Sequence, residues 1–384
     1  MANFLFDPYS TQAFLKGVIP ANKQVRANWL QSMFPMQSTP VYTETLTYDK
    51  ELMVRNTPGQ YVAPRVDAPL IQLQGFKAQE LRPVYTKYAM QTPDFEQLQG
   101  RQMGQQFNEL PDFSKATLTY MQKQAERGEA GIEVLKEIQA RNIILYGTHT
   151  AISPYHPTVT YDFQRTKTTT AAGFDSGYVV EVDLTTLDNG GVGHLDWNHA
   201  GNPLEHLQLM VRAVNRRSSC NKILMSNDAY NKLEAYITAN YKDAATLTLA
   251  VQQRINLQVL PVLGKYQDLT FRRSLDLSGG NPFSGVTNLV DIYTYEAVYN
   301  DPNIADYNSS LVKLMPDGYV VALPNDLGSQ FYTRVIHPNV NYEPMPVYIN
   351  GWKDQKTGKW EYESHRSYYM TPNDIDSVVC WKVL

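Results

Sequence analysis

Apolar residues recur with a helical period over residues 113–146, the longest regular stretch of the chain. In "FSKATLTYMQKQAERGEAGIEVLKEIQARNIILY" they stand three, four or seven positions apart, which places them on one face of a helix. The members of this stripe are Leu118, Met121, Ala125, Ile132, Leu135 and Ile138. The pattern predicts a single spine helix of roughly 50 Å with one packed side and one exposed side. Gly128 and Gly131 weaken the helix locally and favour a bend there.

A period of two dominates the region before this helix. The stretch "VYTETLTYDKELMVRN" alternates in part, and the "TPGQYVAPRVDAPL" that follows is polar and rich in proline. Residues 41–75 are therefore predicted to form a long two-stranded hairpin with a turn-rich tip. Such a hairpin has no core of its own and needs a surface to lie on. Residues 1–40, interrupted by prolines, are predicted to be an arm rather than a domain.

Helices and strands are mixed over residues 202–335, which predicts a separate α+β domain. The stretch "NPLEHLQLMVRAVNRRS" reads as a helix with Asn202 as its cap and Pro203 in its first turn. A short buried strand, "CNKILM", and another helix after Ser-Asn-Asp follow it. Further strands are expected after that helix, and the chain ends in the strand-like stretches "PMPVYINGW", "WEYESHRSYYM" and "DSVVCWKVL".

The stretch "LVKLMPDGYVVALPND" (311–326) places a Pro-Asp-Gly turn between two apolar runs. Pro316 presets the φ angle of the turn, Asp317 tolerates the corner, and Gly318 can supply a positive φ. We expect a tight hairpin that closes the edge of a sheet, with a role in folding rather than in ligand binding.

The composition is that of an ordinary globular protein, with 384 residues of which 43% are hydrophobic and 19% charged. The 26 tyrosines, against 13 phenylalanines, favour β-rich structure or extensive association. The net charge of −4 predicts no strong attraction to nucleic acid or to an anionic membrane.

The location suggested by the sequence is intracellular. Two cysteines, Cys220 and Cys380, exclude a disulfide framework and favour folding in a reducing compartment. The opening "MANFLFDPYSTQAF" lacks the pattern of a signal peptide, and the apolar runs are too short to span a bilayer. We expect a soluble protein with no membrane partner.

Candidate catalytic or metal-binding chemistry is sparse. "GHLDWNHAGNPLEHL" contains His194, Asp196, His199 and His206, but neither an HExxH nor an HxH pattern. Scattered loop histidines are the favoured interpretation, and a metal-dependent hydrolase using His194, Asp196 and His199 is the alternative. There is no GxSxG motif, and "DNGGVGH" lacks the context of a phosphate loop. We expect a protein that is not an enzyme and needs no cofactor.

The order of these parts resembles the major capsid proteins of tailed bacteriophages, which have the HK97 fold, and specifically the phage lambda-type E family. Four stretches carry the resemblance: "VYTETLTYDKELMVRNTPGQYVAPRVDA", "GFKAQELRPVYTKYA", the long helix ending in "LYG", and "WEYESHRSYYMTPNDIDSVVCWKVL". The most specific match is Pro316-Asp317-Gly318 through Leu323, which is similar to a turn-and-strand pattern of that family. Residues 185–201 and 275–290 depart from the family pattern.

The resemblance implies an α+β, HK97-like chain with the parts of a capsid subunit. These parts are an N-terminal arm (1–40), an E-loop (41–75), a P-domain (76–201) with the spine helix 113–146, an A-domain (202–335), and C-terminal strands returning to the P-domain (336–384).

The function implied is that of a major head protein. Pentamers and hexamers would form the icosahedral shell around packaged double-stranded DNA, with only weak, non-specific contact to that DNA. The expected partners are other copies of the chain, a scaffold, a portal, a maturation protease and in some cases a decoration protein. Assembly is expected in the host cytoplasm, and the final location in the virion. An encapsulin-like shell protein is a further alternative.

Specific contact residues are expected on the hairpin. Those predicted to touch neighbouring subunits are Tyr48, Lys50, Arg55, Tyr61 and Arg65.

Overall fold

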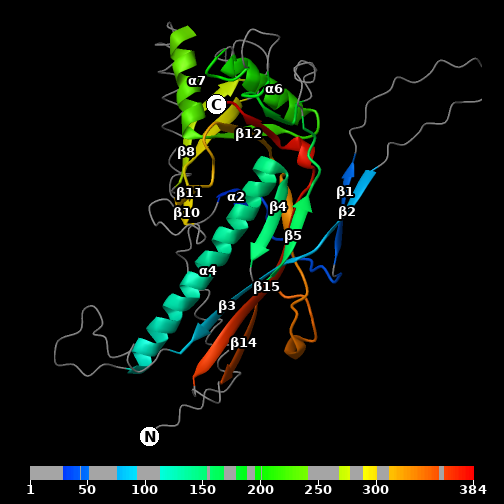
Figure 1. Ribbon diagram of the computed structural model, residues 1–384, viewed down its shortest axis with the longest axis vertical. Coiled ribbons are helices and arrows are strands. Elements are labelled where there is room, and N and C mark those ends of the chain that lie inside the picture. The colour runs from blue at the N-terminus through cyan, green and yellow to red at the C-terminus, as the bar shows by residue number, and fades with distance from the viewer. Residues whose placement is uncertain are drawn as a thin grey trace, which may run out of the picture.

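A computed structural model shows a long helix that joins two sheets (Figure 1). The structure describes residues 29–43, 45–51, 76–92, 113–153, 156–167, 179–187, 195–199, 201–240, 268–276, 289–300, 311–353 and 359–384. A six-stranded sheet with two helices lies at one end of the long helix, and a four-stranded sheet lies along its other half.

The long helix is α4, Phe113–Tyr146, with the bounds that the sequence predicts. It ends at Gly147, whose φ of 64° is a left-handed conformation that favours glycine. Gly128 has a packing reason, since a Cβ atom there would lie 2.5 Å from the ring of Tyr88 on β3 (Val84–Gln91). The glycine therefore lets strand and helix approach closely.

The packed face of α4 differs from the predicted apolar stripe. Met121, Ala125 and Ile132 are buried as expected, but the side chain of Leu135 is 51% exposed. Charged residues occupy buried positions instead, among them Glu129, which pairs with Arg366. The predicted stripe is therefore wrong at Leu135. Arg366 on the strand β15 (Trp360–Pro372) allows the helix to bury the carboxylate of Glu129.

The six-stranded sheet has the order β6-β16-β12-β7-β9-β8. Its strands are β6 (Glu181–Asp183), β16 (Val379–Lys382), β12 (Tyr319–Pro324), β7 (Cys220–Met225), β9 (Leu289–Tyr295) and β8 (Leu269–Asp276). One face packs against α6 (Pro203–Asn215) and α7 (Asn227–Asn240), and the other against the end of α4. Because both faces are covered, consecutive residues of an inner strand can be apolar and buried, as Val320–Leu323 of β12 are.

The helices α6 and α7 both begin where the sequence predicts a helix start. Asn202 accepts hydrogen bonds from the backbone of Leu204 and Glu205 at the start of α6, where Pro203 is the first residue. Ser226 accepts one from Ala229 at the start of α7.

The four-stranded sheet is built around β15 (Trp360–Pro372), the longest strand described. On one edge β15 pairs with β3, and on the other with β14 (Tyr348–Lys353) and β13 (Gly328–Tyr332), all antiparallel. The spine helix packs on one face through Met90, Met121, Ala125 and Tyr362.

Two shorter hairpins and a short helix complete the described chain. β4 (Thr148–Ser153) pairs with β5 (His156–Asp162) directly after the spine helix, and β10 (Val298–Asn300) pairs with β11 (Leu311–Lys313). The short helix α2 (Trp29–Ser32) buries Trp29 and Leu30 in the main core. The last part of the predicted arm is thus anchored, while residues 1–28 lie outside the described part.

The C-terminal segment is divided between the two sheets, in contrast to the prediction for 336–384. β14 and β15 lie in the four-stranded sheet, but β16 enters the six-stranded sheet between β6 and β12. β6 and β13 likewise pair outside the domains predicted for their positions. The sheet that each strand joins depends on pairing between segments far apart in the chain. Local sequence patterns carry little information about such pairing.

Candidate assembly site at the root of the hairpin

A two-stranded ribbon lies at the base of the predicted hairpin, and its second strand begins at Phe76, just beyond the predicted bounds 41–75. β1 (Leu46–Glu51) pairs antiparallel with β2 (Phe76–Leu81), from Leu46 opposite Leu81 to Glu51 opposite Phe76. In Figure 1 this β1–β2 ribbon projects beside the body of the molecule, away from the spine helix. The remainder of the hairpin, 52–75, lies outside the described residues.

Side chains of β1 alternate between the ribbon's two faces. Tyr48 and Lys50 are buried, whereas Thr47 and Asp49, which alternate with them, are exposed. The Tyr48 ring meets Phe163 edge to face, with ring centroids 5.0 Å apart. Burial raises the pKa of the Tyr48 hydroxyl to about 12, so it is neutral at physiological pH. The inner face therefore fixes the ribbon to its own chain.

Lys50 forms a buried ion pair at the same place. Its Nζ atom lies 2.8 Å from Oδ2 of Asp376 and donates a hydrogen bond of 2.6 Å to the carbonyl of Gln164. Asp376 also accepts hydrogen bonds from the backbone and hydroxyl of Thr166, each 2.9 Å long. Burial alone would raise the pKa of Asp376, but hydrogen bonds from Lys50 and Thr166 bring it below its ordinary value.

Arg217 connects this pair to the six-stranded sheet. The residue lies just after α6, and its guanidinium is 2.8 Å from Asp374 and 3.6 Å from Asp376. Both carboxylates flank the start of η3 (Ile375–Ser377), a short 3-10 helix that leads into β16. The direction of the β1–β2 ribbon is thus tied to α6 and to the C-terminal strand through one cluster of charges.

Arg165 forms a second buried connection close by. Its guanidinium donates to the carbonyl groups of Ile143 and Leu145, at 2.7 and 2.8 Å, and so satisfies the last turn of α4. It also lies 3.6 Å from Glu181 of β6. The end of the spine helix is thereby joined to the edge of the six-stranded sheet.

The predicted contact residues divide into two groups. Tyr48 and Lys50 lie at the ribbon base and bind within the chain, while Arg55, Tyr61 and Arg65 lie outside the described residues. Sequence patterns did not indicate Asp376, Arg217 or Arg165, because each acts on segments far away along the chain. The period-two alternation of β1 was the one signal that could indicate which side of the ribbon is buried.

The predicted turn at 316–318 has the expected conformation but not the expected partners. Gly318 has a φ of 76°, and a Cβ atom there would lie 2.9 Å from Leu384. Its N–H donates to Ser226 Oγ at 2.9 Å, and its carbonyl accepts from Val383 at 2.7 Å. The flanking strands do not pair with each other, because β11 pairs with β10 while β12 lies between β16 and β7.

The prediction of a hairpin at a sheet edge is therefore wrong. Pro316, Asp317 and Gly318 instead link a separate small ribbon to the interior of the six-stranded sheet. On the solvent side, Lys313 pairs with Asp317 at 2.7 Å.

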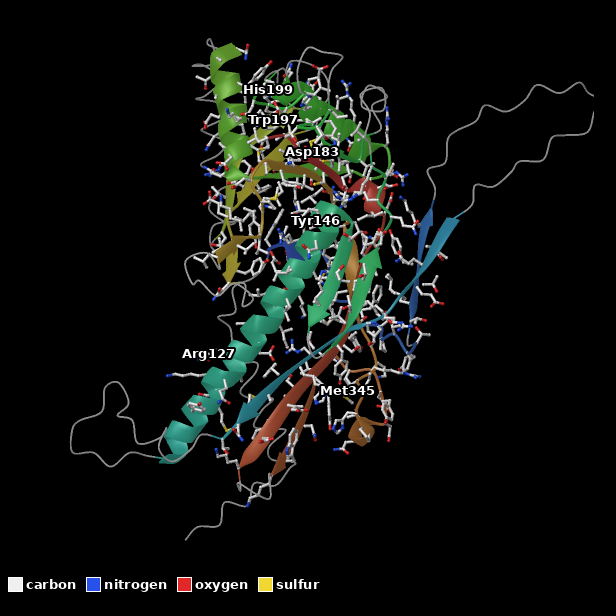
Figure 2. The ribbon with its side chains drawn as sticks, in the orientation of Figure 1. Arg127, Tyr146, Asp183, Trp197, His199 and Met345 are labelled. Atoms are coloured by element: carbon white, nitrogen blue, oxygen red, sulfur yellow. The ribbon has the colours of Figure 1, made fainter. Side chains whose placement is uncertain are left out.

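The alternative metal site is not assembled by the residues that the structure describes. Asp196 Oδ1 lies 2.6 Å from His199 Nδ1 and also accepts from the backbone of Asn198. His206 accepts a 3.1 Å hydrogen bond from Trp197 Nε1, and His194 lies outside the described part. Figure 2 shows Trp197 and His199 at the end with the six-stranded sheet, on the far side from the four-stranded sheet. In the described ranges no group of three or more His, Cys, Asp or Glu side chains could hold a metal ion.

None of the helices in the described ranges is long and apolar enough to cross a membrane.

Comparison with known proteins identifies a family that this sequence matches. The sequence matches the family described as phage major capsid protein E over residues 15–383. A search of curated proteins finds no match.

Three solved structures are similar to this chain at low sequence identity. A protein assigned as a prophage capsid protein of E. coli CFT073 has a TM-score of 0.60 at 14% identity, covering 98% of this chain and 99% of its own. The mature capsid of bacteriophage PhiM1 has a TM-score of 0.41 at 12% identity, covering 92% of this chain and 86% of its own. The SrpI encapsulin of Synechococcus elongatus PCC 7942 has a TM-score of 0.39 at 11% identity, and the match covers 94% of this chain and 89% of the encapsulin chain.

The spine helix, the projecting ribbon and the two sheets are the parts of an HK97-like subunit, and the family match covers almost all of the chain. The chain belongs to the phage major capsid protein E family and is a shell-forming protein of the virion capsid.

Proposed function

We propose that this chain is the major head protein of a tailed double-stranded DNA phage, assembled as pentamers and hexamers into an icosahedral shell. The observation that carries the proposal is the β1–β2 ribbon, together with the family match over residues 15–383. A two-stranded ribbon is marginal in water by itself and gains stability by packing on another surface. Heterologous contacts of this kind, repeated around an axis, close into rings.

The base and the tip of the hairpin have different roles in this proposal. Arg55, Tyr61 and Arg65 contact neighbouring subunits directly. Tyr48 and Lys50, which are buried within their own chain, set the direction in which the hairpin leaves it. The charge cluster of Lys50, Asp376 and Arg217 then fixes the angle between hairpin and body in each subunit.

The proposed partners follow from the family. They are a scaffold and a portal, a maturation protease, and a decoration protein where one is present, with assembly in the host cytoplasm. Packaged DNA would be held by weak, non-specific contact, because a net charge of −4 gives little overall attraction to phosphate.

A loop-replacement variant tests the proposal. Residues 52–75 are replaced by Asn-Gly, a dipeptide that suits a two-residue hairpin turn, so that β1 and β2 stay paired. We expect subunits that fold and remain soluble but no longer close into shells in negative-stain electron microscopy. Because β1 and β2 are retained, the thermal unfolding temperature of the variant subunit should match that of the unassembled wild type. Normal closed particles from this variant would refute the proposed role of the hairpin.

A further inference from the structure

The segment 334–344 lies between β13 and β14 along the chain and protrudes from the four-stranded sheet. Its two ends are held together as a narrow hairpin. Arg334 forms a β-bridge with Pro344, and the backbone of Val335 donates a hydrogen bond of 3.2 Å to the carbonyl of Glu343. The segment is therefore a braced projection with a defined surface.

The segment is attached to the face of the four-stranded sheet that is turned away from the spine helix. Ile349 of β14 packs against the cluster that contains Met121 of the helix, so the next residue, Asn350, faces the opposite side. The side-chain amide of Asn350 lies 3.2 Å from Nε2 of His337 in the segment. In the view of Figure 2, Met345, which directly follows the segment, lies on the opposite side of β15 from α4. The segment thus projects where the subunit's own helix does not cover the sheet.

Hydrogen bonds within the tip of the segment hold its backbone in place. The tip contains η2 (Pro338–Val340), a single turn of 3-10 helix. His337 caps the start of this turn by accepting a hydrogen bond of 3.2 Å from the backbone of Asn339. At its end, the backbone of Asn341 donates to the carbonyl of Pro338 at 3.1 Å. A tip that is already ordered loses little conformational freedom when another molecule binds to it.

Tyr342 has a backbone conformation that is unfavourable for an aromatic residue. Its φ is 58°, in the left-handed region, and that of Asn341 before it is 50°. Asparagine adopts this region readily, whereas a bulky side chain is strained there. Strained residues of this kind cluster at functional sites, where the surrounding structure holds them in place. Half of the Tyr342 side chain is exposed, so packing within its own subunit uses only part of its surface.

The tip carries two exposed apolar side chains and no charge. The side chain of Ile336 is 67% exposed, and the pairing of Arg334 with Pro344 places Ile336 opposite Tyr342 across the hairpin. Residues 335–342 contain no Asp, Glu, Lys or Arg. The buried centre of a protein–protein interface is likewise depleted of charged residues and enriched in tyrosine. The composition of the tip therefore fits a surface that becomes buried on association.

We propose that the segment 334–344 is a contact ridge that packs against a second copy of this chain in the shell, with Ile336 and Tyr342 as its anchors. This inference rests on the proposed function and adds a contact surface to it, separate from the β1–β2 ribbon. The partner is a second copy because the chain belongs to a shell-forming family, and a closed shell surrounds each subunit with identical ones. Association removes the two apolar side chains from water, and the ordered tip presents them at little further entropic cost.

Photo-crosslinking of the full-length chain tests the partner directly. The photoreactive amino acid p-benzoyl-phenylalanine replaces Tyr342 in one variant and Ile336 in another, and assembled particles are irradiated and separated on a denaturing gel. We expect a band of twice the subunit mass from particles and none from unassembled subunits. Particles that give no band of doubled mass, or that give a cross-link only to a protein of another mass, would overturn the proposal.

Two substitutions separate assembly from folding. Tyr342→Asn removes the ring and supplies a residue that tolerates the left-handed conformation, and Ile336→Asn removes the other anchor. The urea midpoint of the unassembled Tyr342→Asn subunit should not fall below that of the wild type, because strain is relieved. We expect each variant to raise about tenfold the concentration at which half of the chain is in particles, as for loss of an interface anchor. Unchanged assembly of both variants would contradict the proposal.

Ile152→Asn is the matched control, because Ile152 is 79% exposed and lies on β4, outside the contact ridge. This variant should assemble as the wild type does. An equal loss of assembly in Ile152→Asn would show that the effect is not specific to the contact ridge and would overturn the assignment. If the wild-type chain forms no particles, the proposed function fails and the contact ridge with it, whereas wild-type particles combined with the absence of a cross-link refute the contact ridge alone.

Discussion

Lys50 and Asp376 show how single residues set the geometry of this subunit. Both side chains are buried, at 7% and 3% exposure, and they join segments from opposite ends of the chain. An ion pair out of water contributes little by itself to the free energy of folding, because desolvation offsets the attraction. Removal of one partner is costly, however, since the other charge then stays buried without compensation.

Substitution of Asp376 by asparagine should therefore destabilise the subunit markedly. Asparagine keeps the shape and one acceptor but leaves the Lys50 ammonium unpaired, and a loss of about 3 kcal/mol is expected. Urea denaturation of the unassembled chain measures this change. The control is Lys382→Gln, which breaks an ion pair to Asp183 that is 35% and 37% exposed and should cost less than about 1 kcal/mol. Equal losses in the free energy of unfolding would show that breaking the buried Lys50–Asp376 pair is no more costly than breaking a half-exposed one.

At the residue scale, the local backbone conformation and helix capping could be predicted from the sequence, but the contacts between residues far apart in the chain could not. The positive φ of Gly318 and the capping by Asn202 follow from their neighbours in sequence. The contact of Gly318 with Leu384, and that of Lys50 with Asp376, depend on the complete fold. Of the five predicted contact residues, only the placement of Tyr48 and Lys50 is described, and their contact with a neighbouring subunit stays a prediction.

The spine helix shows the same contrast at the scale of elements. Its bounds, 113–146, follow from period and from Gly147, so they were predicted correctly. The buried face was predicted less well, because Glu129, Lys136 and Glu137 are buried along with the apolar residues. Glu137, for example, accepts hydrogen bonds from the backbone of α2 and from the hydroxyl of Tyr295. A buried carboxylate of this kind cannot be distinguished from an exposed one by periodicity.

Two substitutions on α4 should separate the buried from the exposed face. Ile132 is 3% exposed, so Ile132→Ala should lower the free energy of unfolding by about 2–4 kcal/mol through the cavity it leaves. Leu135 is 51% exposed, so Leu135→Ala should change it by less than about 0.5 kcal/mol. Denaturation of the unassembled subunits gives both values. A cost at Leu135 as large as that at Ile132 would contradict this assignment and would fit the predicted stripe, which includes both residues.

The order of strands in the sheets could not be predicted from local pattern. β16 enters the six-stranded sheet beside β12, and β13 leaves that region to pair with β15. Both pairings join segments that are separated by other elements, so no short stretch of sequence contains the information. The resemblance to a capsid family predicted the overall fold despite this, because it concerns the order of all the parts together.

At the scale of the whole molecule, the subunit has two sheets joined by a spine helix and a ribbon that leaves the body. The two buried charge clusters, around Asp376 and around Arg165, lie where these parts meet. We infer that they hold the relative orientation of the parts, which a closed shell requires of every copy.

The most direct test of this account is the size and shape of the full-length chain after expression. Size-exclusion chromatography followed by negative-stain electron microscopy should show closed particles, or rings of five and six subunits, in the fraction of high mass. The same preparation of the 52–75 replacement variant should contain only small species. A wild-type protein that stays monomeric at every concentration, and that forms neither rings nor shells when a scaffold is supplied, would contradict the central claim that this chain builds a capsid.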